Sequence, residues 1–363
     1  MLLVMAEHQS NTTWTNWSGK LSASPREIVQ VGTIEAIRAE LSAASKGGWS
    51  VRTAGTAHSH YPLLPTNGVL LDTRPLSGLV EVDQETPSAT FRAGTKIHAC
   101  GRPLLDHGLG LINQGDIDQQ SIGGAIATGT HGTGTELGSF SSVVEKLSIM
   151  LVDGSVVTCD QHTESELFEA ARLSLGAVGI VLEATLKVRK AYRLKEEQWQ
   201  EPLDSVMERI ESLTSASRHF EYFWWPGQDG ALCKSINVTE EPGQYPLGSE
   251  GRRLAWSFEV LPNQRLHPHT EMEYAVPAEH GPACIAEIRE LLKKQFPEVA
   301  WPVEYRTLAG DEKGVARAAS AARARRRARP RPFGARGSRG FARAAAAAAP
   351  ARRRGSPPAS PRP

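Results

Sequence analysis

The residues best suited to hold a ligand lie between Asn113 and Gly134, in the sequence NQGDIDQQSIGGAIATGTHGTG. Glycines recur there at short intervals, and glycine permits positive φ angles and close approach of the backbone to a ligand. Successive exposed N–H groups in such turns form a concave site for an anion, usually a phosphate. Threonine hydroxyls and the imidazole of His131 add side-chain donors. The stretch predicts a loop around a pyrophosphate, with an ordinary Gly/Thr-rich turn as the alternative.

This stretch matches neither of the two common phosphate-binding motifs. It has no G-x-G-x-x-G that opens a helix, and it has no G-x-x-x-x-G-K-[ST]. A dinucleotide bound here is therefore not held in the manner of a Rossmann fold.

A second stretch, RTAGTAHS from Arg52 to Ser59, follows a short apolar segment that reads as a strand. Taken together, the two stretches resemble the flavin domain of the vanillyl-alcohol-oxidase superfamily, and within it the sugar-1,4-lactone oxidases and the related alditol oxidases. The resemblance covers the chain from about Trp17 to Asp311. The order of the motifs makes it specific. The matching pieces are R-x-x-G-x-x-H-S from Arg52, G-D-I-D from Gly115, and S-I-G-G-A-I-A-T-G-T-H-G-T-G from Ser121.

The resemblance implies an FAD cofactor attached covalently through His58, whose ring would bond to the 8α-methyl carbon of the flavin. The alternative for His58 is a hydrogen-bonded turn residue. His58 and His60 also form an H-x-H pair, but no third ligand is placed nearby, so we expect no metal there. The cofactor-binding residues implied by the resemblance are Arg52, Gly55, Thr56, Ala57, His58, Ser59, Gly115, Asp116, Ser121, Gly124, Thr128, Gly129, Thr130, His131 and Ile180.

Asp116 and Asp118 alone would suggest a site for a divalent cation. The resemblance instead places Gly115 and Asp116 beside the reactive edge of the flavin. Alditol oxidases have a serine at the position of Asp116, so the Gly-Asp-Ile-Asp form favours a lactone substrate.

Glu304 and Arg306 stand in the segment V-E-Y-R-T. On a strand, residues two apart point to the same face, so the pair would share one side. From spacing alone, a surface ion pair is the simpler interpretation. The resemblance implies that this Glu-x-Arg pair faces the flavin ring over the substrate, where an arginine can stabilise developing negative charge. Glu304, Arg306 and Asp116 are thus the candidate catalytic residues.

Hydrophobic periodicity and turn residues predict the elements that position these loops. We expect a helix over Thr95–His107 with a break or kink at Pro103. A hairpin should turn at Asp153-Gly154. The other expected elements of this part are helices at Pro25–Leu41 and Ser165–Leu175, and strands at Trp49–Arg52, Val69–Leu71, Gly78–Val82, Ala89–Ala93, Glu145–Val152, Ser155–Cys159 and Ile180–Val188.

A second region follows Tyr192 and reads mainly as broad strands, with one helix over Ala283–Phe296. The resemblance implies a cap domain with an antiparallel sheet that covers the flavin ring. The aromatic run Tyr222–Trp225 could line the substrate pocket, but we expect it to be sheet core. The expected strands are Phe220–Trp225, Arg253–Leu261 and Met272–Val276.

These elements predict an α+β fold. The resemblance implies that this fold consists of an N-terminal extension at 1–23, a PCMH-type FAD-binding domain of two subdomains at 24–193, and a truncated antiparallel-sheet cap domain at 194–312. The implied function is FAD-dependent oxidation of the C2 hydroxyl of an aldono-1,4-lactone, L-gulono- or D-arabinono-1,4-lactone, by hydride transfer to the flavin. Oxygen or another acceptor would take the electrons. A sugar alcohol is the alternative substrate.

Composition sets outer limits on this interpretation. The chain has 363 residues, 40% hydrophobic, which is enough for two domains with cores. Its formal charge of +1 indicates no nucleic acid and no membrane surface as a partner. Four cysteines without a C-x-x-C motif fit a reduced, cytoplasmic setting. Membrane association is not indicated, because no apolar run approaches the length of a membrane span.

Residues 313–363 differ in kind from the rest of the chain. They are rich in Arg, Ala, Pro, Gly and Ser, and they contain neither Asp nor Glu after Glu312. Such a segment cannot bury enough apolar surface to fold, so we expect a disordered basic tail. We interpret it as a shifted reading frame, with a genuine tail for nucleic acid or anionic lipid as the alternative. If the shifted frame removes groups that catalysis needs, the chain would be an inactive truncated remnant, which is the competing hypothesis to an enzyme.

Overall fold

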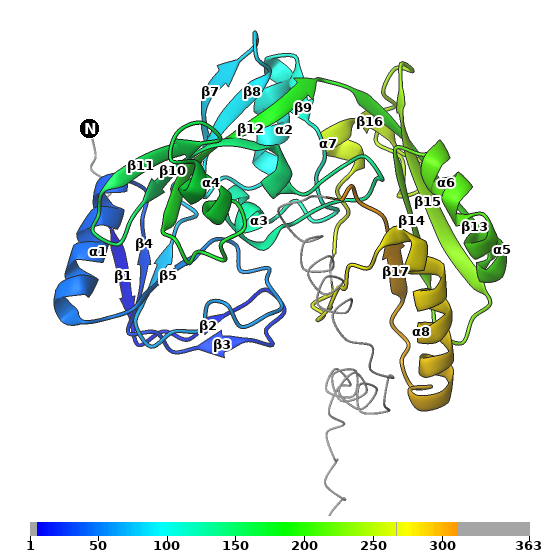
Figure 1. The fold of residues 1–363 in the computed structure, drawn as a ribbon, viewed down its shortest axis with the longest axis horizontal. Coiled ribbons are helices and arrows are strands. Elements are labelled where there is room, and N and C mark those ends of the chain that lie inside the picture. The colour runs from blue at the N-terminus through cyan, green and yellow to red at the C-terminus, as the bar shows by residue number, and fades with distance from the viewer. Residues whose placement is uncertain (1–5, 266, 311–363) are drawn as a thin grey trace, which may run out of the picture.

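The structure is a computed structural model that describes residues 6–265 and 267–310. Figure 1 shows two bodies that form an arch, joined where the long strand β12 (Ile180–Lys190) leads into β13 (Arg193–Pro202). The first body contains two sheets and a small hairpin, and the second contains one antiparallel sheet with helices on one side. The expected α+β class is confirmed.

The first sheet mixes parallel and antiparallel strands in the order β1-β4-β6-β5. Both β4 and β5 run parallel to β6, and β1 runs antiparallel to β4. The helix α1 (Ile34–Gly47) joins β4 to β5. The strands are β1 (Glu7–Ser10), β4 (Glu27–Gln30), β5 (Val51–Ala54) and β6 (Val69–Asp72), and the separate hairpin consists of β2 (Trp14–Thr15) and β3 (Ser22–Ala23).

The helix predicted over Pro25–Leu41 is wrong in its first half. Residues 27–30 form the strand β4, and the helix begins only after Thr33, whose hydroxyl accepts a hydrogen bond from Ala36 N at 3.1 Å. Val29 and Val31 are fully buried against this sheet. Alternating β-branched residues therefore mark a strand, and Thr33 is the N-cap that starts the helix.

The second sheet is antiparallel and has the order β11-β10-β12-β8-β7, with β9 paired to β12. Helices α2 and α3 pack beside it, and their buried side chains share one core with its strands. The strands are β7 (Leu79–Asp83), β8 (Ser88–Arg92), β9 (Leu109–Leu111), β10 (Val144–Met150) and β11 (Val156–Asp160); the helices are α2 (His98–Asp106), α3 (Ile122–Thr128), α4 (Ser165–Ala171) and the 3-10 turn η1 (Phe140–Val143).

Two details of this sheet bear on the sequence expectations. The hairpin at Asp153-Gly154 is confirmed, because β10 pairs with β11 and Gly154 adopts φ 83° in the turn. Of the break or kink expected at Pro103, the break is wrong, since α2 runs through this residue. The buried side chains of Cys100 and Leu104 on either side of Pro103 hold the helix against the sheet, which offsets the lost backbone hydrogen bond.

The sheet of the second body has the order β16-β13-β15-β14-β17. Helices α5, α6 and α8 cover one of its faces, where Tyr222 and Trp224 are fully buried. This confirms those two aromatic residues as core. The remaining elements are the strands β14 (His219–Trp224), β15 (Gly230–Thr239), β16 (Leu254–Trp256) and β17 (Val303–Arg306), and the helices α5 (Leu203–Glu208), α6 (Ile210–Ala216), α7 (Ser257–Val260), η2 (Ala278–His280) and α8 (Gly281–Gln295).

Two strand predictions in this body are wrong. The segment Arg253–Leu261 is a strand only at β16 and then turns into the helix α7. Met272–Val276 lies in a segment that joins no sheet among the described residues. Its alternation is real, but Met272 and Tyr274 are exposed, whereas the intervening Glu273 forms ion pairs with the rest of the protein. The charged side chains, rather than a neighbouring strand, fix this segment.

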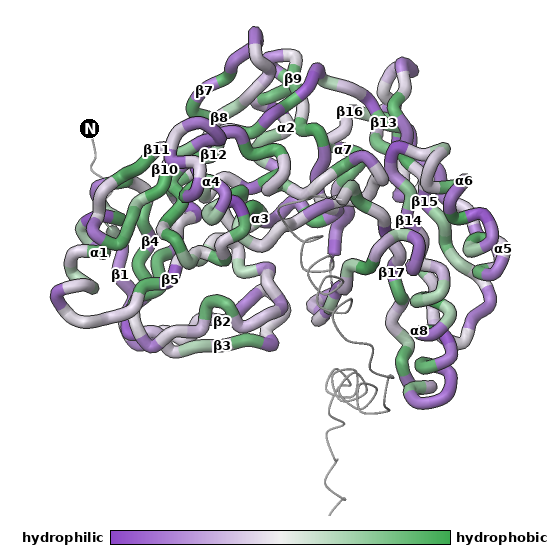
Figure 2. Tube along the Cα trace, in the orientation of Figure 1, coloured by the Kyte–Doolittle hydropathy of each residue, from purple (hydrophilic) through white to green (hydrophobic). Residues whose placement is uncertain are grey.

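Hydropathy follows this architecture. Figure 2 shows hydrophobic stretches along β4 and β5 of the first body, and mixed hydrophobic and hydrophilic residues along the outer helix α8. The basic tail at 313–363 lies outside the described residues, so its expected disorder stays a prediction.

Candidate functional site

The two sequence motifs meet in space. Gly55 follows β5, and a Cβ atom built on it would lie 1.9 Å from the Ser121 hydroxyl oxygen. Ser121 is the N-cap of α3 and is 3% exposed. A Cβ on Gly124 would lie 3.2 Å from the same oxygen. The RTAGTAHS loop and the start of the glycine-rich helix thus touch at positions where a side chain would separate them.

His58 lies in a tight turn of the first loop. Ala57, just before it, has φ 59°, and its carbonyl accepts a hydrogen bond from Trp17 N at 2.9 Å. The Trp17 ring stacks on His58 at a centroid distance of 5.4 Å. His58 Nδ1 is buried and has no hydrogen-bond partner among the described residues. Burial, and then the nearby His60, lower the pKa of His58, so the ring is a neutral imidazole with a free nitrogen.

The N-terminal hairpin packs against this turn and holds it in place. This role was not predicted, since residues 1–23 were expected to be an extension. Asn16 is 4% exposed and donates a hydrogen bond to Ser59 O at 3.0 Å. Its side-chain oxygen accepts hydrogen bonds from the backbone of Lys20 and Leu21. The signal available in the sequence was the run TWTNWS, whose two tryptophans indicate packing rather than a free extension.

The G-D-I-D loop lies against the end of the glycine-rich stretch. Gly115 is buried, and a Cβ there would lie 3.3 Å from His131 O. A Cβ on Gly132 would come within 2.3 Å of Gln114 O, so the two loops are in direct contact. Asp116 turns toward the second body, where its carboxylate pairs with Arg265 and its carbonyl accepts a hydrogen bond from Asn263 N at 2.7 Å.

The segment from Thr128 to His131 leaves α3 through Gly129, which has φ 70° and ends the helix. Thr128 is exposed, and its hydroxyl donates back to Gly124 O at 2.9 Å and lies 3.4 Å from the Thr130 hydroxyl. His131 is almost buried, with 8% of its side chain exposed. Its Nε2 lies 3.1 Å from a carboxylate oxygen of Glu273, in the second body.

Two predicted residues stay apart from this group. Arg52 is exposed on β5, where it pairs with Leu70. Ile180 is buried in the core beside Val29 and Leu71 at the start of β12. The loop that precedes Ile180, rather than Ile180 itself, contacts the glycine-rich helix, since Leu175 N donates to Ala127 O of α3 at 3.2 Å.

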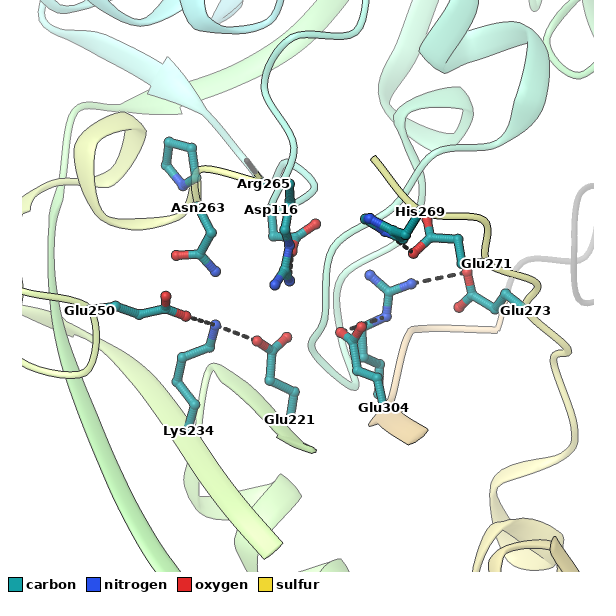
Figure 3. A network of polar contacts seen from close by, with 12 residues as sticks. Asp116, Glu221, Lys234, Glu250, Asn263, Arg265, His269, Glu271, Glu273 and Glu304 are labelled. Atoms are coloured by element: carbon teal, nitrogen blue, oxygen red, sulfur yellow. Dashed lines mark hydrogen bonds and ion pairs between the residues drawn. The ribbon is translucent and has the colours of Figure 1, made fainter. Parts of the chain in front are cut away.

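Glu304 and Arg306 lie two residues apart on the edge strand β17 and therefore share one face of the sheet. Figure 3 shows Glu304 on the same side as Glu273 and Glu221. Arg306 Nε lies 3.4 Å from a Glu304 oxygen, and Arg306 Nη2 donates to Glu273 at 2.9 Å. Burial, together with the nearby carboxylates of Glu221 and Asp116, raises the pKa of Glu304 to about 7 against the opposing effect of Arg306. A carboxyl group that titrates near neutrality beside a fixed guanidinium is suited to proton transfer.

A ladder of polar side chains crosses the site-facing side of the cap sheet. The backbone register places Gln198, Lys234, Glu221 and Arg306 opposite one another on β13, β15, β14 and β17. Lys234 and Glu221 are buried and form an ion pair, and Glu250 lies 3.7 Å from Lys234 (Figure 3). Burial alone would lower the pKa of Lys234, but Glu221 and Glu250 raise it, so the lysine is charged. This ladder and the residues Arg265 and Glu273 were not predicted from the sequence.

Direct contacts fix the two bodies to each other around these groups. Thr133 Oγ1 donates to Phe220 O at 2.7 Å, and Gly134 N donates to Thr307 O at 2.7 Å. A second series of contacts between the two bodies begins at Arg253. This residue forms a buried ion pair with Glu196 and donates to Asn263 Oδ1 at 2.9 Å. Asn263 in turn donates from its backbone to Asp116. The Asp116 loop is thereby held by the cap sheet.

The loops suit an elongated cofactor with polar groups. Their close glycine contacts leave backbone exposed. Several buried side-chain atoms on or next to them have no partner among the described residues, namely His58 Nδ1, His60 Nδ1, Asn113 Nδ2 and Gln120 Oε1, and the same holds for Thr307 Oγ1 just after β17. Buried polar atoms without a partner are costly, so such atoms indicate groups that a ligand would satisfy. In the described part of the chain, no cluster of His, Cys, Asp and Glu residues is arranged to hold a metal ion.

Comparison with solved structures defines the class of protein. The chain superposes on a variant of cholesterol oxidase from Brevibacterium sterolicum with a TM-score of 0.72 and 16% identity, covering 83% of this chain and 72% of that one. The corresponding values for 6-hydroxy-D-nicotine oxidase from Arthrobacter nicotinovorans are 0.58 and 15%, covering 72% and 65%. The fold is thus that of the FAD-dependent oxidoreductases with a PCMH-type domain. Residues 25–160 match the family described as FAD binding domain.

Sequence relatives narrow this class. Residues 184–256 and 244–328 match the family described as D-arabinono-1,4-lactone oxidase. L-gulono-1,4-lactone dehydrogenase of Mycobacterium tuberculosis strain H37Rv is 30% identical over 338 residues, covering 82% of this chain and 78% of the relative. Mouse L-gulonolactone oxidase is 26% identical over 353 residues, covering 85% and 79%. The chain therefore belongs to the family of FAD-dependent sugar-1,4-lactone oxidases and dehydrogenases, and FAD is its cofactor.

Proposed function

We propose that this protein oxidises the C2 hydroxyl of an aldono-1,4-lactone, of the L-gulono or D-arabinono type, to a carbonyl. Bound FAD supplies the acceptor for the hydride that leaves the C2 carbon. The observation that carries the proposal is the placement of Glu304 and Arg306 opposite the FAD-binding loops, beside the Asp116–Arg265 ion pair. The matched family and the relatives named for lactone oxidation support the choice of substrate.

In this proposal, Glu304 is the general base. Its pKa of about 7 lets it accept the proton of the C2 hydroxyl near neutral pH. Arg306 is held by carboxylates on two sides and stabilises the negative charge that develops on the C2 oxygen. Asp116, fixed by Arg265, accepts hydrogen bonds from other hydroxyl groups of the sugar.

We assign the cofactor to the loops at Gly55–Ser59, Gly115–Asp116, Ser121–Gly124 and Thr128–His131. The close contact between Gly55 and Ser121 and the free Nδ1 of His58 support this assignment. We further propose that His58 is the covalent attachment point. Its turn is fixed by Trp17 and Asn16, so the neutral ring is held in one orientation.

The domain limits belong to the same proposal. We place the FAD-binding domain at 24–193 and the cap domain at 194–312, which agrees with the separation of the sheets at β12 and β13.

Oxygen is the proposed electron acceptor, because Gly115 has no side chain that would block the approach of oxygen to the reactive edge of the flavin. We propose a cytoplasmic location, which is supported by four cysteines that are all free. No helix in the described ranges is long and apolar enough to cross a membrane.

One experiment tests the reaction and another the covalent link. The purified 363-residue protein is expected to be yellow, and L-gulono-1,4-lactone without oxygen is expected to bleach it, whereas xylitol is expected to have little effect. Bleaching by xylitol alone would point to a sugar-alcohol oxidase, and no bleaching by either would contradict the proposed function.

For the link, acid precipitation is expected to leave the colour in the pellet. The variant His58→Ala should release all flavin into the supernatant, while His60→Ala, two residues away, should not. Release from the unchanged protein would contradict the covalent bond and leave FAD binding intact.

A further inference from the structure

The segment at 267–276 crosses between the two bodies and presents two carboxylates to the same side (Figure 3). Glu271 and Glu273 each divide their oxygens between two partners. The oxygens of Glu271 lie 3.6 Å from His60 Nε2 and 3.4 Å from His269 Nε2. Those of Glu273 lie 3.1 Å from His131 Nε2 and 2.9 Å from Arg306 Nη2. Glu273 thus connects the glycine-rich loop to strand β17.

The groups around Glu273 keep its side chain ionised. Burial alone would raise its pKa, but the hydrogen bond with His131 and the charge of Arg306 lower the pKa to about 2. At neutral pH the residue is therefore a carboxylate that can only accept hydrogen bonds. Arg306, the proposed catalytic cation, has its Nε directed to Glu304 and its Nη2 directed to Glu273, so its guanidinium plane is fixed from two sides.

His131, the other partner of Glu273, has a contact at each of its two ring nitrogens. Its Nδ1 lies 2.8 Å from Gly132 O, and its Nε2 faces Glu273. Both contacts are to oxygens that accept and do not donate. Only an imidazole with a proton on each nitrogen satisfies both contacts at once.

We propose that Glu273 is a positioning residue that holds Arg306 in its catalytic orientation and keeps His131 as a double donor, so that two cations are fixed between the FAD-binding loops and the cap sheet. The catalytic part of this inference rests on the proposed function. Without Glu273, Glu304 is the one ion-pair partner left to Arg306 among the described residues, and Gly132 O is the one hydrogen-bond partner left there to His131. Glu271 does not contact either cation in the described structure and provides a matched control on the same segment.

The test is a pair of isosteric variants, Glu273→Gln and Glu271→Gln, in the 363-residue protein. With ¹⁵N-labelled histidine and arginine, NMR at neutral pH reports the imidazole N–H protons and the Arg306 Nε–H signal, which His131→Gln and Arg306→Lys assign. The unchanged protein is expected to show two N–H protons on His131. Glu273→Gln should remove one of them and shift the Arg306 signal, whereas Glu271→Gln should leave both residues unchanged.

Three outcomes would overturn the inference: a single N–H proton on His131 in the unchanged protein, unaltered signals in Glu273→Gln, or the same loss in Glu271→Gln. If Glu273→Gln does not fold by circular dichroism, the His131 spectrum of the unchanged protein still decides.

Lactone oxidation adds a kinetic test, in which Glu273→Gln should lower kcat about tenfold to a hundredfold with a smaller change in KM. An unchanged protein that does not oxidise lactone would defeat the proposed function while leaving the NMR result valid.

Discussion

Gly55 lies so close to Ser121 that a methyl group on residue 55 would come within 1.9 Å of the serine hydroxyl oxygen. The two residues belong to different motifs, 66 positions apart in sequence, and their contact brings the His58 turn to the start of α3. Ser121 has little room to move away from residue 55, because it is 3% exposed and forms a β-bridge with Lys96. The close packing of the proposed FAD-binding loops therefore requires glycine at position 55.

We expect Gly55→Ala to destabilise the protein by about 1–3 kcal/mol through overpacking, and to lower FAD retention on purification. The measurements are the denaturation midpoint in urea and the ratio of flavin absorbance to protein absorbance. Gly230→Ala is the control, because a Cβ there meets only Glu201 O at 3.9 Å. If Gly55→Ala keeps the flavin and the stability of the unchanged protein, the two loops separate more easily than this contact implies.

Gly115→Ala is predicted to slow oxygen consumption more than lactone oxidation with an artificial dye as acceptor. The added methyl group would lie 3.3 Å from His131 O and 3.5 Å from Thr130 Cγ2, so a small local shift is enough to accommodate it. Glycine leaves space for oxygen at the proposed reactive edge, and alanine reduces it. Rates with oxygen and with the dye, measured on one preparation, give the comparison. An equal reduction of both rates would contradict the proposed role of Gly115.

The pKa of Glu304 predicts a dependence of stability on pH. Its folded-state value, about 7, is raised above the ordinary 4.5, so its contribution to stability is fully present below pH 4.5 and is lost as pH rises through 7. The slope for one proton is at most about 1.4 kcal/mol per pH unit, and less here because 26% of the side chain is exposed. Glu273 acts in another pH range: its pKa is lowered from 4.5 to about 2, so its contribution to stability is present above pH 4.5 and is lost as pH falls from 4.5 through 2.

Glu304→Gln should remove this decline in stability between pH 4.5 and 7. Urea denaturation of both proteins at pH 5 and pH 8 measures it, with the exposed Glu197→Gln as control. The same variant should abolish most lactone oxidation, because glutamine cannot accept the hydroxyl proton. Parallel pH curves for Glu304→Gln and the unchanged protein would show that the carboxyl group does not titrate in this range.

Much of the fold could be predicted because local signals agreed with the final contacts. The hairpin at Asp153-Gly154 and the helix α8 follow from turn chemistry and from apolar spacing that needs no distant partner. Met272–Val276 shows the opposite case, since an alternating pattern cannot say whether a partner strand exists. The pattern there arises because Glu273 within the segment and Glu271 just before it reach histidine and arginine side chains far apart in sequence.

In the candidate site, too, some residues could be located from the sequence and others could not. Motifs located the loops of His58, Asp116 and His131, because short sequences with special backbone geometry are visible locally. Arg265 and Lys234 were missed, since their importance comes only from the register of the cap sheet and from carboxylates that the fold brings to them. Nothing near either residue in the sequence indicates a cation that is paired with a carboxylate.

The buried Lys234–Glu221 pair leads to the last prediction. Lys234 is 2% exposed and Glu221 is 6% exposed, and Lys234 lies opposite Glu221 on the next strand, so neither charge can reach water easily. Lys234→Met should destabilise the protein by about 3–5 kcal/mol, because it leaves the carboxylate of Glu221 buried and unpaired. The double variant Lys234→Met with Glu221→Gln should recover most of that loss. Urea denaturation of the single variants, the double variant and the unchanged protein completes a double-mutant cycle. A double variant as unstable as the sum of the two single variants would mean that the side chains contribute independently and that the ladder across the cap sheet is not a coupled unit.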